Sequence, residues 1–345
     1  MEPLIYLMAY AFTIWFIFFP RSLSKKSFFI TWYLFSISLS IIIRSSIGLV
    51  ESADIDGYIV NMKIDAVIPY FLREPIFWFG IRFLYDIFNN GIVVFIFLDT
   101  VLFLLVYVAI SKCKKVFYPF IESSNINYLY FAFFLFFPYV MGMHNIYRQL
   151  LATFIFLIAI TLIADKKIVK GFLTSLVAVL IHNPVGLFFT ILVISMKNNF
   201  LKYSSFILLF IVIIFMQSLL QVDSAYISRE GSIEIGSSIA YLYLVVLYIL
   251  LLIILFIEFK SNRRTNTFFV SIYLMLAIIY SYSVFMFSSE QSQRIIFYIF
   301  GILFPFYGFY FEHKFKPVIY SRLIFFHATL APLILIYNTT IDIGL

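Results

Sequence analysis

Long apolar runs separated by short polar segments dominate the pattern of this chain. Twelve of the runs are long enough to cross, or nearly cross, the ~30 Å hydrocarbon core of a membrane as helices. They cover residues 3–20, 27–48, 92–110, 127–143, 149–164, 168–182, 184–196, 203–220, 239–258, 268–288, 295–311 and 322–338. The pattern predicts an all-α polytopic membrane protein with about 12 transmembrane helices, in which residues 1–345 form a single transmembrane domain.

Basic residues fall between alternate apolar runs. Of the 24 lysines and arginines, 17 form six clusters: Arg21/Lys25/Lys26, Lys112/Lys114/Lys115, Lys166/Lys167/Lys170, Lys197/Lys202, Lys260/Arg263/Arg264 and Lys314/Lys316/Arg322. Cytoplasmic loops of membrane proteins carry an excess of such residues, so we expect all six clusters inside and both termini outside. The net charge of +7 therefore reports topology, and we expect no nucleic-acid partner.

One further apolar segment, PIFWFGIRFLYDIF at 75–88, does not fit a simple crossing. The loop before it and the helix after it both start outside, so we predict an interfacial or re-entrant helix. Pro75 suits the first helical position, and the acidic Glu74 favours a helix N-terminus. The region 168–196 leaves two alternatives, two short spans or a re-entrant hairpin that turns near His182.

Two segments on the predicted periplasmic side are long enough to fold over the membrane surface and recognise a ligand. The first, 49–91, includes the interfacial helix and is rich in Asp and Tyr before it. The second, 221–238, reads QVDSAYISREGSIEIGSS. The predicted cytoplasmic loops are short and basic, which leaves no room for a nucleotide-binding domain.

Composition excludes several classes of protein. The chain is 63% hydrophobic and 12% charged, whereas soluble domains carry about 25% charged residues. The single cysteine, Cys113, excludes an intramolecular disulfide and a thiol metal site. The sequence has no P-loop, H-E-x-x-H, G-x-S-x-G or G-x-G-x-x-G motif, so we expect neither a cofactor nor a metal.

Arginines mark the predicted outer ends of several spans. Arg148 and Arg294 each open a run that leads from outside to inside, and Arg44 and Arg73 lie on the same side. Placing an arginine at the centre of a membrane helix costs roughly 2.5–3.5 kcal/mol of insertion free energy. We therefore expect an arginine at the end of such a helix to have an anionic partner. Guanidinium groups and free N–H groups at helix N-termini both bind phosphate. Two or three arginines around one diphosphate would stabilise it as a leaving group.

Each of these residues also has a structural interpretation. Arg148 can mark the membrane boundary by snorkelling. His182 is equally compatible with a buried, hydrogen-bonded histidine, and Asp99, in mid-span, is either functional or hydrogen-bonded to a hydroxyl. The other outer arginines can pair with nearby acids: Arg44 with Glu51, Arg229 with Glu230, and Arg294 with Glu290.

Four motifs, taken in order, resemble a known family. N-I-Y-R-Q-L-L-A at 145–152 opens a helix, and A-V-L-I-H-N-P at 178–184 ends the next one after a basic loop. The other two are an earlier D-x-x-x-Y and E-P pair, at Asp54, Tyr58 and Glu74-Pro75, and a later Q-R-I-I-F-Y-I-F that contains Arg294. Together they resemble the Wzy/EpsG-type O-antigen or exopolysaccharide polymerases. That family often has Ser after the histidine, where this chain has Asn183.

The resemblance implies a multi-pass, GT-C-like glycosyltransferase of the bacterial inner membrane with its active site facing the periplasm. It would join undecaprenyl-diphosphate-linked oligosaccharide repeat units into O-antigen or a related polysaccharide, without metal or cofactor. Donor and acceptor would reach it through the membrane lipid, and a chain-length regulator protein is a candidate partner. Two alternatives stay open, a flippase that transports lipid-linked oligosaccharide and an O-antigen ligase.

Candidate roles follow from this resemblance and from residue chemistry. An acceptor hydroxyl needs a group that orients or deprotonates it. The candidates for catalysis are His182, Glu74, Asp54 and His144. The candidates for binding the diphosphate are Arg148, Arg294, Arg73 and Arg44. The candidates for binding the sugars are Asp56, Tyr58, Arg229 and Glu290.

Overall fold

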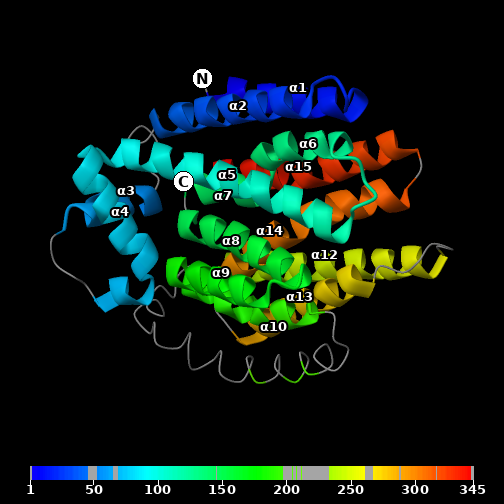
Figure 1. The fold of residues 1–345 in the computed structure, drawn as a ribbon. Helices are drawn as coiled ribbons and strands as arrows, with labels where there is room; N and C mark the ends of the chain where they lie inside the picture. Colours follow the sequence, from blue (N-terminus) through cyan, green and yellow to red (C-terminus); the bar gives the residue numbers. More distant parts are fainter. Residues whose placement is uncertain are drawn as a thin grey trace.

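In the computed structural model, the described residues are 2–45, 53–64, 69–144, 146–196, 204, 207, 211, 233–260, 267–286, 289–315 and 317–342. Every regular element among them is a helix (Figure 1), which confirms the all-α class. The elements are α1 (Glu2–Phe18), α2 (Lys25–Ser45), α3 (Ala53–Met62), η1 (Pro69–Arg73), α4 (Pro75–Phe88), α5 (Gly91–Phe117), η2 (Ser124–Ile126), α6 (Asn127–Ala132), η3 (Phe133–Leu135), α7 (Phe137–His144), α8 (Tyr147–Ala164), α9 (Ile168–Ile181), η4 (Asn183–Phe188), α10 (Phe189–Ile194), α12 (Ile233–Lys260), α13 (Thr267–Met286), α14 (Ser289–Lys314) and α15 (Val318–Asp342).

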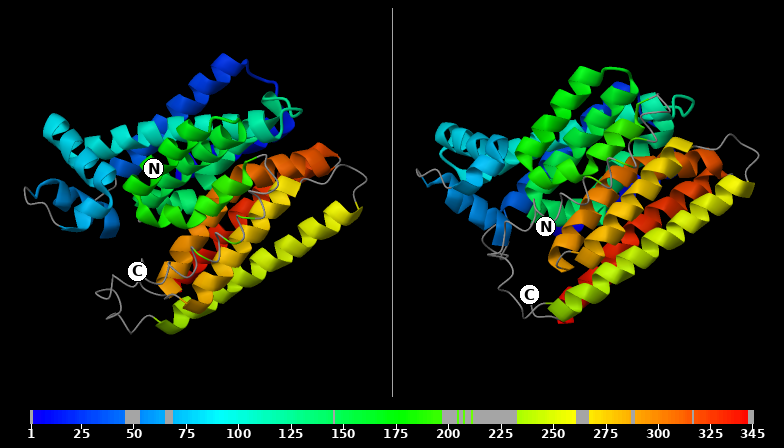
Figure 2. Two further views of the ribbon diagram at one scale, coloured as in Figure 1. Left: turned by 60° about the horizontal axis from the view of Figure 1, so that its bottom comes forward. Right: turned by 90° about the horizontal axis from the view of Figure 1, so that it is seen from below.

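The bundle is organised around α8. This helix contacts α5, α9 and α14. Of its 18 residues 89% are buried, whereas only 28% are buried in the most apolar 18-residue stretch of α12. The helices α12 to α15 lie side by side as one layer (yellow to red in Figure 2). Through α14 this layer packs on α5, α7 and α8. The centre of the bundle is therefore protein-enclosed, while α12 lies at its edge.

Six of the described helices are long and apolar enough to cross a membrane: α2, α5, α8, α12, α13 and α14. Shorter apolar helical stretches occupy Leu4–Phe18, Ile168–Ile181, Asn183–Ile194 and Val318–Leu330. The chain is thus a polytopic membrane protein, as predicted. The exact number of crossings stays a prediction, because the run at 203–220 lies almost wholly outside the described residues.

The run at 127–143 is not one continuous helix, which corrects the prediction. It divides into α6, η3 and α7, and the backbone leaves the helical region at Phe136, with φ −77° and ψ 123°. Pro138 follows in the first turn of α7, where its missing N–H is tolerated. Residues 128–139 are all buried. Irregular backbone is tolerated at membrane depth when protein surrounds it, as it does here.

The helix predicted at 75–88 is present with those bounds as α4. Pro75 lies in its first turn, and Asn89 ends it in the left-handed region at φ 49°. The next residue, Asn90, caps α5 because its Oδ1 accepts from the backbone N–H groups of Ile92 (2.9 Å) and Val93 (3.2 Å). This tight connection fixes α4 beside the start of α5. The interfacial position of α4 stays a prediction.

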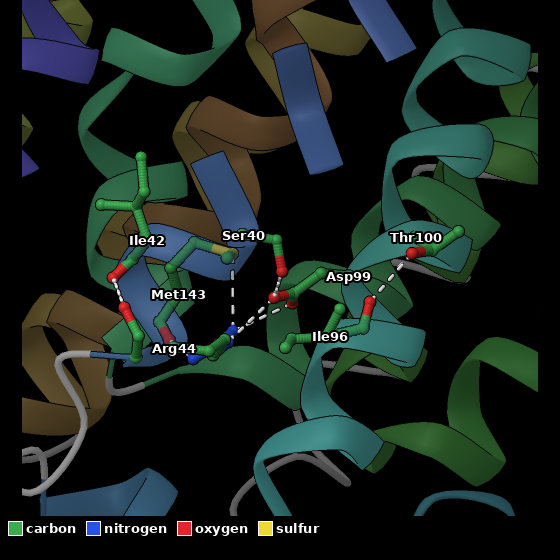
Figure 3. A network of polar contacts seen from close by, with 8 residues as sticks. Ser40, Ile42, Arg44, Ile96, Asp99, Thr100 and Met143 are labelled. Carbon is green, nitrogen blue, oxygen red and sulfur yellow. Dashed lines mark hydrogen bonds and ion pairs between the residues drawn. The ribbon is translucent and has the colours of Figure 1, made fainter. Parts of the chain in front are cut away.

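Asp99, in the first third of α5, has a cationic partner from a distant part of the chain (Figure 3). Arg44 of α2 donates from Nε to Oδ2 (2.8 Å) and from Nη2 to Oδ1 (2.9 Å). The Ser40 hydroxyl also donates to Oδ2 (2.6 Å), and Arg44 Nη1 donates to the Met143 carbonyl oxygen (2.6 Å). Both charged side chains are fully buried. The pair therefore joins α2, α5 and α7.

We expect Asp99→Asn to lower the free energy of unfolding by about 3–5 kcal/mol, because it leaves the Arg44 guanidinium buried without a counter-charge. Thermal unfolding of the detergent-purified protein measures this effect. Asp56→Asn, at a half-buried position on α3, is the matched control. An unchanged melting temperature for Asp99→Asn would contradict the assignment.

Candidate active site

Glu74 is the centre of a buried polar cluster, the Glu74 cluster, which also contains Arg148 and His182. It precedes α4, yet its side chain makes no capping hydrogen bond to that helix. Its Oε2 accepts from Nη1 of Arg148, and its Oε1 accepts from Nδ1 of His182. Glu74 is only 2% exposed. A carboxylate buried to this degree needs charged or hydrogen-bonding partners, and here both oxygens have one.

Three helix ends bring these residues together. Arg148 is the second residue of α8, and His182 directly follows the last residue of α9. The two helices pack together and are joined by a turn at 165–167, so the start of α8 lies beside the end of α9. Glu74 reaches the same place because α4 packs on α9. Each functional side chain thus lies at a helix end rather than within a span.

Arg148 lies in an aromatic enclosure. Its Nε donates to the Tyr58 hydroxyl (3.1 Å). Its guanidinium carbon lies 5.3 Å, 5.2 Å and 5.8 Å from the ring centroids of Tyr58, Trp78 and Phe77. A planar guanidinium can stack on rings and bond a carboxylate at once, which an ammonium cannot do in the same way. The side chain is buried and ion-paired, so snorkelling does not describe it.

Burial acts in opposite directions on the two titrating groups. Burial raises the pKa of Glu74, but His182 and Arg148 outweigh it and hold that pKa below its ordinary value. Burial lowers the pKa of His182, and it outweighs the opposing effect of Glu74, while Arg148 and Arg294 lower that pKa further. Near neutral pH, Glu74 is therefore ionised and the His182 ring is neutral.

The hydrogen bond to Glu74 fixes the tautomer of this neutral ring. A carboxylate only accepts, so Nδ1 of His182 carries the proton and Nε2 has the lone pair. An imidazole held in this way can take a proton at Nε2, and the carboxylate behind it stabilises the imidazolium that forms. The cluster therefore has the arrangement of a general base with an orienting acid.

A residue that the sequence analysis missed completes the cluster. The ring of Tyr298 stacks on that of His182, with centroids 5.9 Å apart and planes at 28°. Tyr298 is 1% exposed, and its hydroxyl has no hydrogen-bond partner within the described residues. It lies four residues after Arg294, so both occupy one face of α14. The four-residue spacing from Arg294 could have pointed to Tyr298 in the sequence. It did not single this residue out, because the chain has 25 tyrosines.

The start of α14 is tied to the start of α8. Nε2 of Gln149 donates to the backbone carbonyl oxygen of Arg294, while Oε1 of the same amide is buried without a partner in the described part of the chain. Arg294 itself is half-buried, and its charge contributes to the pKa of His182. Arg148 and Arg294, each predicted to open a helix, thus lie at the same end of the bundle, and the charges of both act on His182.

A comparison with protein-family models gives a match over most of this chain. The model of the EpsG family matches residues 50–341. The chain belongs to the EpsG family. The matched region contains every residue of the Glu74 cluster, and family membership gives the protein a polysaccharide-polymerase-type role of the glycosyltransferase kind. No curated protein and no solved structure matched the chain.

The other predicted site residues of this EpsG-family protein fall into three groups. Arg44 is not in the cluster, because its guanidinium is fully buried and bonded to Asp99 and Met143; we therefore assign it a structural role instead of diphosphate binding. Arg73 is exposed next to Glu74, and Asp56 is half-buried on α3. The side chains of Asp54, His144 and Glu290, and the whole of Arg229, lie outside the described residues.

Among the described residues, no group of three or more His, Cys, Asp or Glu is placed to hold a metal ion.

Arg294→Gln is expected to move the acid limb of the pH–rate profile to higher pH. The variant removes a positive charge that disfavours the imidazolium, so the pKa of His182 rises. A base at Nε2 works only when unprotonated, and the rate then begins to fall at a higher pH as the solution is acidified. The measurement is the initial rate of polymer formation in membrane vesicles against pH. Lys63→Gln, an exposed charge on the same predicted side, is the control, and equal shifts in both variants would contradict the assignment.

Proposed function

We propose that this EpsG-family protein lengthens a polysaccharide by transferring a glycan from a polyprenyl-diphosphate donor. The acceptor is a sugar hydroxyl of a second lipid-linked repeat unit, and the reaction takes place at the outer face of the bacterial inner membrane. The observation that carries the proposal is the Glu74 carboxylate, which joins Arg148 to His182 where α4, α8 and α9 meet.

His182 is the proposed base. Its Nε2 takes the proton of the acceptor hydroxyl as the hydroxyl oxygen forms a bond to the anomeric carbon of the donor. The bond from that carbon to the diphosphate oxygen breaks, and its electron pair leaves with the diphosphate. Glu74 orients the ring through Nδ1 and stabilises the imidazolium. A single displacement of this kind inverts the anomeric carbon.

The leaving diphosphate is proposed to bind at the starts of α8 and α14. Two guanidinium groups, from Arg148 and Arg294, and one carboxylate, from Glu74, leave the cluster with a net positive charge when His182 is neutral. The positive ends of the two helix dipoles add to it. Charge that develops on the diphosphate is therefore stabilised where the bond breaks.

Other residues are proposed to position these groups or to bind the sugars. Tyr58 accepts a hydrogen bond from Arg148, so we assign it the role of positioning the guanidinium instead of binding a sugar. The Tyr298 hydroxyl and the Gln149 side-chain carbonyl oxygen, which have no hydrogen-bond partner among the described residues, are candidate contacts to the substrate. Sugar recognition is assigned to Asp56 and to the two loops predicted on the periplasmic side.

The structure gives less support to the flippase alternative. A flippase for an anionic lipid is expected to present cations through the depth of the bundle. Outside the Glu74 cluster, three buried cations of the described chain are instead paired with acids: Arg44 with Asp99, Arg322 with Glu312, and Lys314 with Glu258. The ligase alternative has no specific observation in its favour. A ligase would be expected to have a larger outer domain than the 18 residues of the predicted outer segment 221–238.

The test is His182→Ala in a strain that lacks its own copy of the protein. We expect polymer formation to fall by about 10²–10⁴-fold, the usual contribution of a general base, while single repeat units still reach the cell surface. Gel analysis of the surface glycan and immunoblotting of the membrane fraction give the two readouts. His327→Ala, the same substitution at an exposed position on α15, is the control. Long-chain polysaccharide from the His182 variant would contradict the proposal, and loss of all exported glycan would favour a flippase.

A further inference from the structure

A second charged feature lies at the end of the bundle opposite to Glu74. The start of α5 is near the cluster, because the ring of Phe95 lies 6.2 Å from that of Tyr58. Lys112 is 17 residues further along the same helix, about 25 Å away at 1.5 Å per residue. In Figure 1 the start of α5 is at the left beside α3 and α4, and its end is at the right. The two sites are thus separated by most of a membrane thickness.

A cavity of about 290 Å³ opens at this end between α2, α5 and α6. Four lysines line it, and no carboxylate does: Lys25, Lys112, Lys114 and Lys115. The aromatic side chains of Phe28, Tyr107 and Tyr130 form apolar walls. The hydroxyl groups of Ser111 and Tyr130 bond to each other (2.8 Å). The cavity therefore combines a concentrated positive charge with an apolar lining.

Two acids whose charges act on these lysines, Glu122 and Asp165, form their ion pairs with other cations. Glu122 accepts from Nε of Arg21 (3.1 Å), and Asp165 accepts from Lys167 (2.6 Å). Within the described part of the chain, none of the four lysines that line the cavity forms an ion pair with a carboxylate. Four like charges around one cavity repel one another, so a bound anion would relieve that repulsion.

The positive field extends around α5. A second cavity, of about 410 Å³, lies between α5, α8 and α10 and shares Lys112 and Lys115 with the first. The hydrogen bond and charge of Lys167, followed by the charges of Lys115 and Lys112, hold the pKa of Asp165 below its ordinary value. An anion at the end of α5 is therefore attracted from either side of the helix.

We propose that the cavity lined by Lys25, Lys112 and Lys114 binds the phosphate group of an anionic phospholipid from the leaflet on that side. Basic pockets between membrane helices bind lipid phosphates in this way. Loop charge alone is enough to orient a membrane protein, and it needs no cavity. Here the lysines come from two helices, with aromatic walls between them, so a headgroup would hold α2 against α5. The proposal is independent of the chemistry at Glu74.

The test is lipid binding to the detergent-purified full chain, measured by native mass spectrometry. The lipids are phosphatidylglycerol and, as a neutral reference, phosphatidylcholine. We expect the unchanged protein to prefer phosphatidylglycerol, and Lys112→Gln with Lys114→Gln to weaken that binding by about 30-fold, roughly fivefold for each lysine. The pair Lys112→Arg with Lys114→Arg keeps the charge and is expected to keep the binding.

The matched control carries Lys26→Gln and Lys170→Gln, which remove two exposed lysines that line neither cavity. It is expected to bind phosphatidylglycerol as the unchanged protein does. An equal loss in both glutamine pairs would overturn the proposal, since it indicates general surface attraction. No preference for phosphatidylglycerol would also overturn it. Displacement of the lipid by millimolar inorganic phosphate would show a site for a soluble anion instead.

Discussion

The structure around the candidate active site depends on one buried carboxylate that serves two partners. Glu74 would be costly to bury alone, and it is retained because Arg148 and His182 each satisfy one of its oxygens. Arg148 and His182 come from different helices. The two hydrogen bonds of Glu74 therefore form only while α4, α8 and α9 keep their relative positions. The burial that the cluster provides keeps His182 neutral, and the hydrogen bond to Glu74 selects the tautomer with the proton on Nδ1. The contacts that stabilise the fold here therefore also prepare the proposed base.

A second buried ion pair, Arg44 with Asp99, supports this arrangement through aromatic side chains. The Arg44 guanidinium carbon lies 5.1 Å from the ring centroid of Phe95 and 5.3 Å from that of Tyr147, the residue before Arg148. Phe95 in turn contacts the ring of Tyr58. The Arg44 pair with Asp99 thus fixes the aromatic side chains on which the Arg148 enclosure rests. Membrane interiors make such pairs costly to break, which suits a part of the protein that has to stay rigid.

The sequence predicted the helices well and their partners poorly. Apolar runs and the Pro75 start located α4 with its observed bounds, and motif order brought Glu74, Arg148 and His182 to attention. Hydropathy indicates whether a residue is in an apolar environment, but not which side chain it contacts. It therefore could not pair Arg44 with Asp99, 55 residues away. For the same reason the break at Phe136 was invisible, because a buried broken helix is as apolar as a continuous one.

Glu74 is proposed to act through His182, and a double-mutant cycle measures the coupling between the two side chains. Rates of polymer formation, each divided by the amount of folded protein, would be compared for Glu74→Gln, His182→Ala and the double variant. Residues that act as a unit give non-additive losses. We expect the double variant to be no slower than His182→Ala, within about twofold. Losses that multiply would contradict it, because they would show that the two side chains act independently.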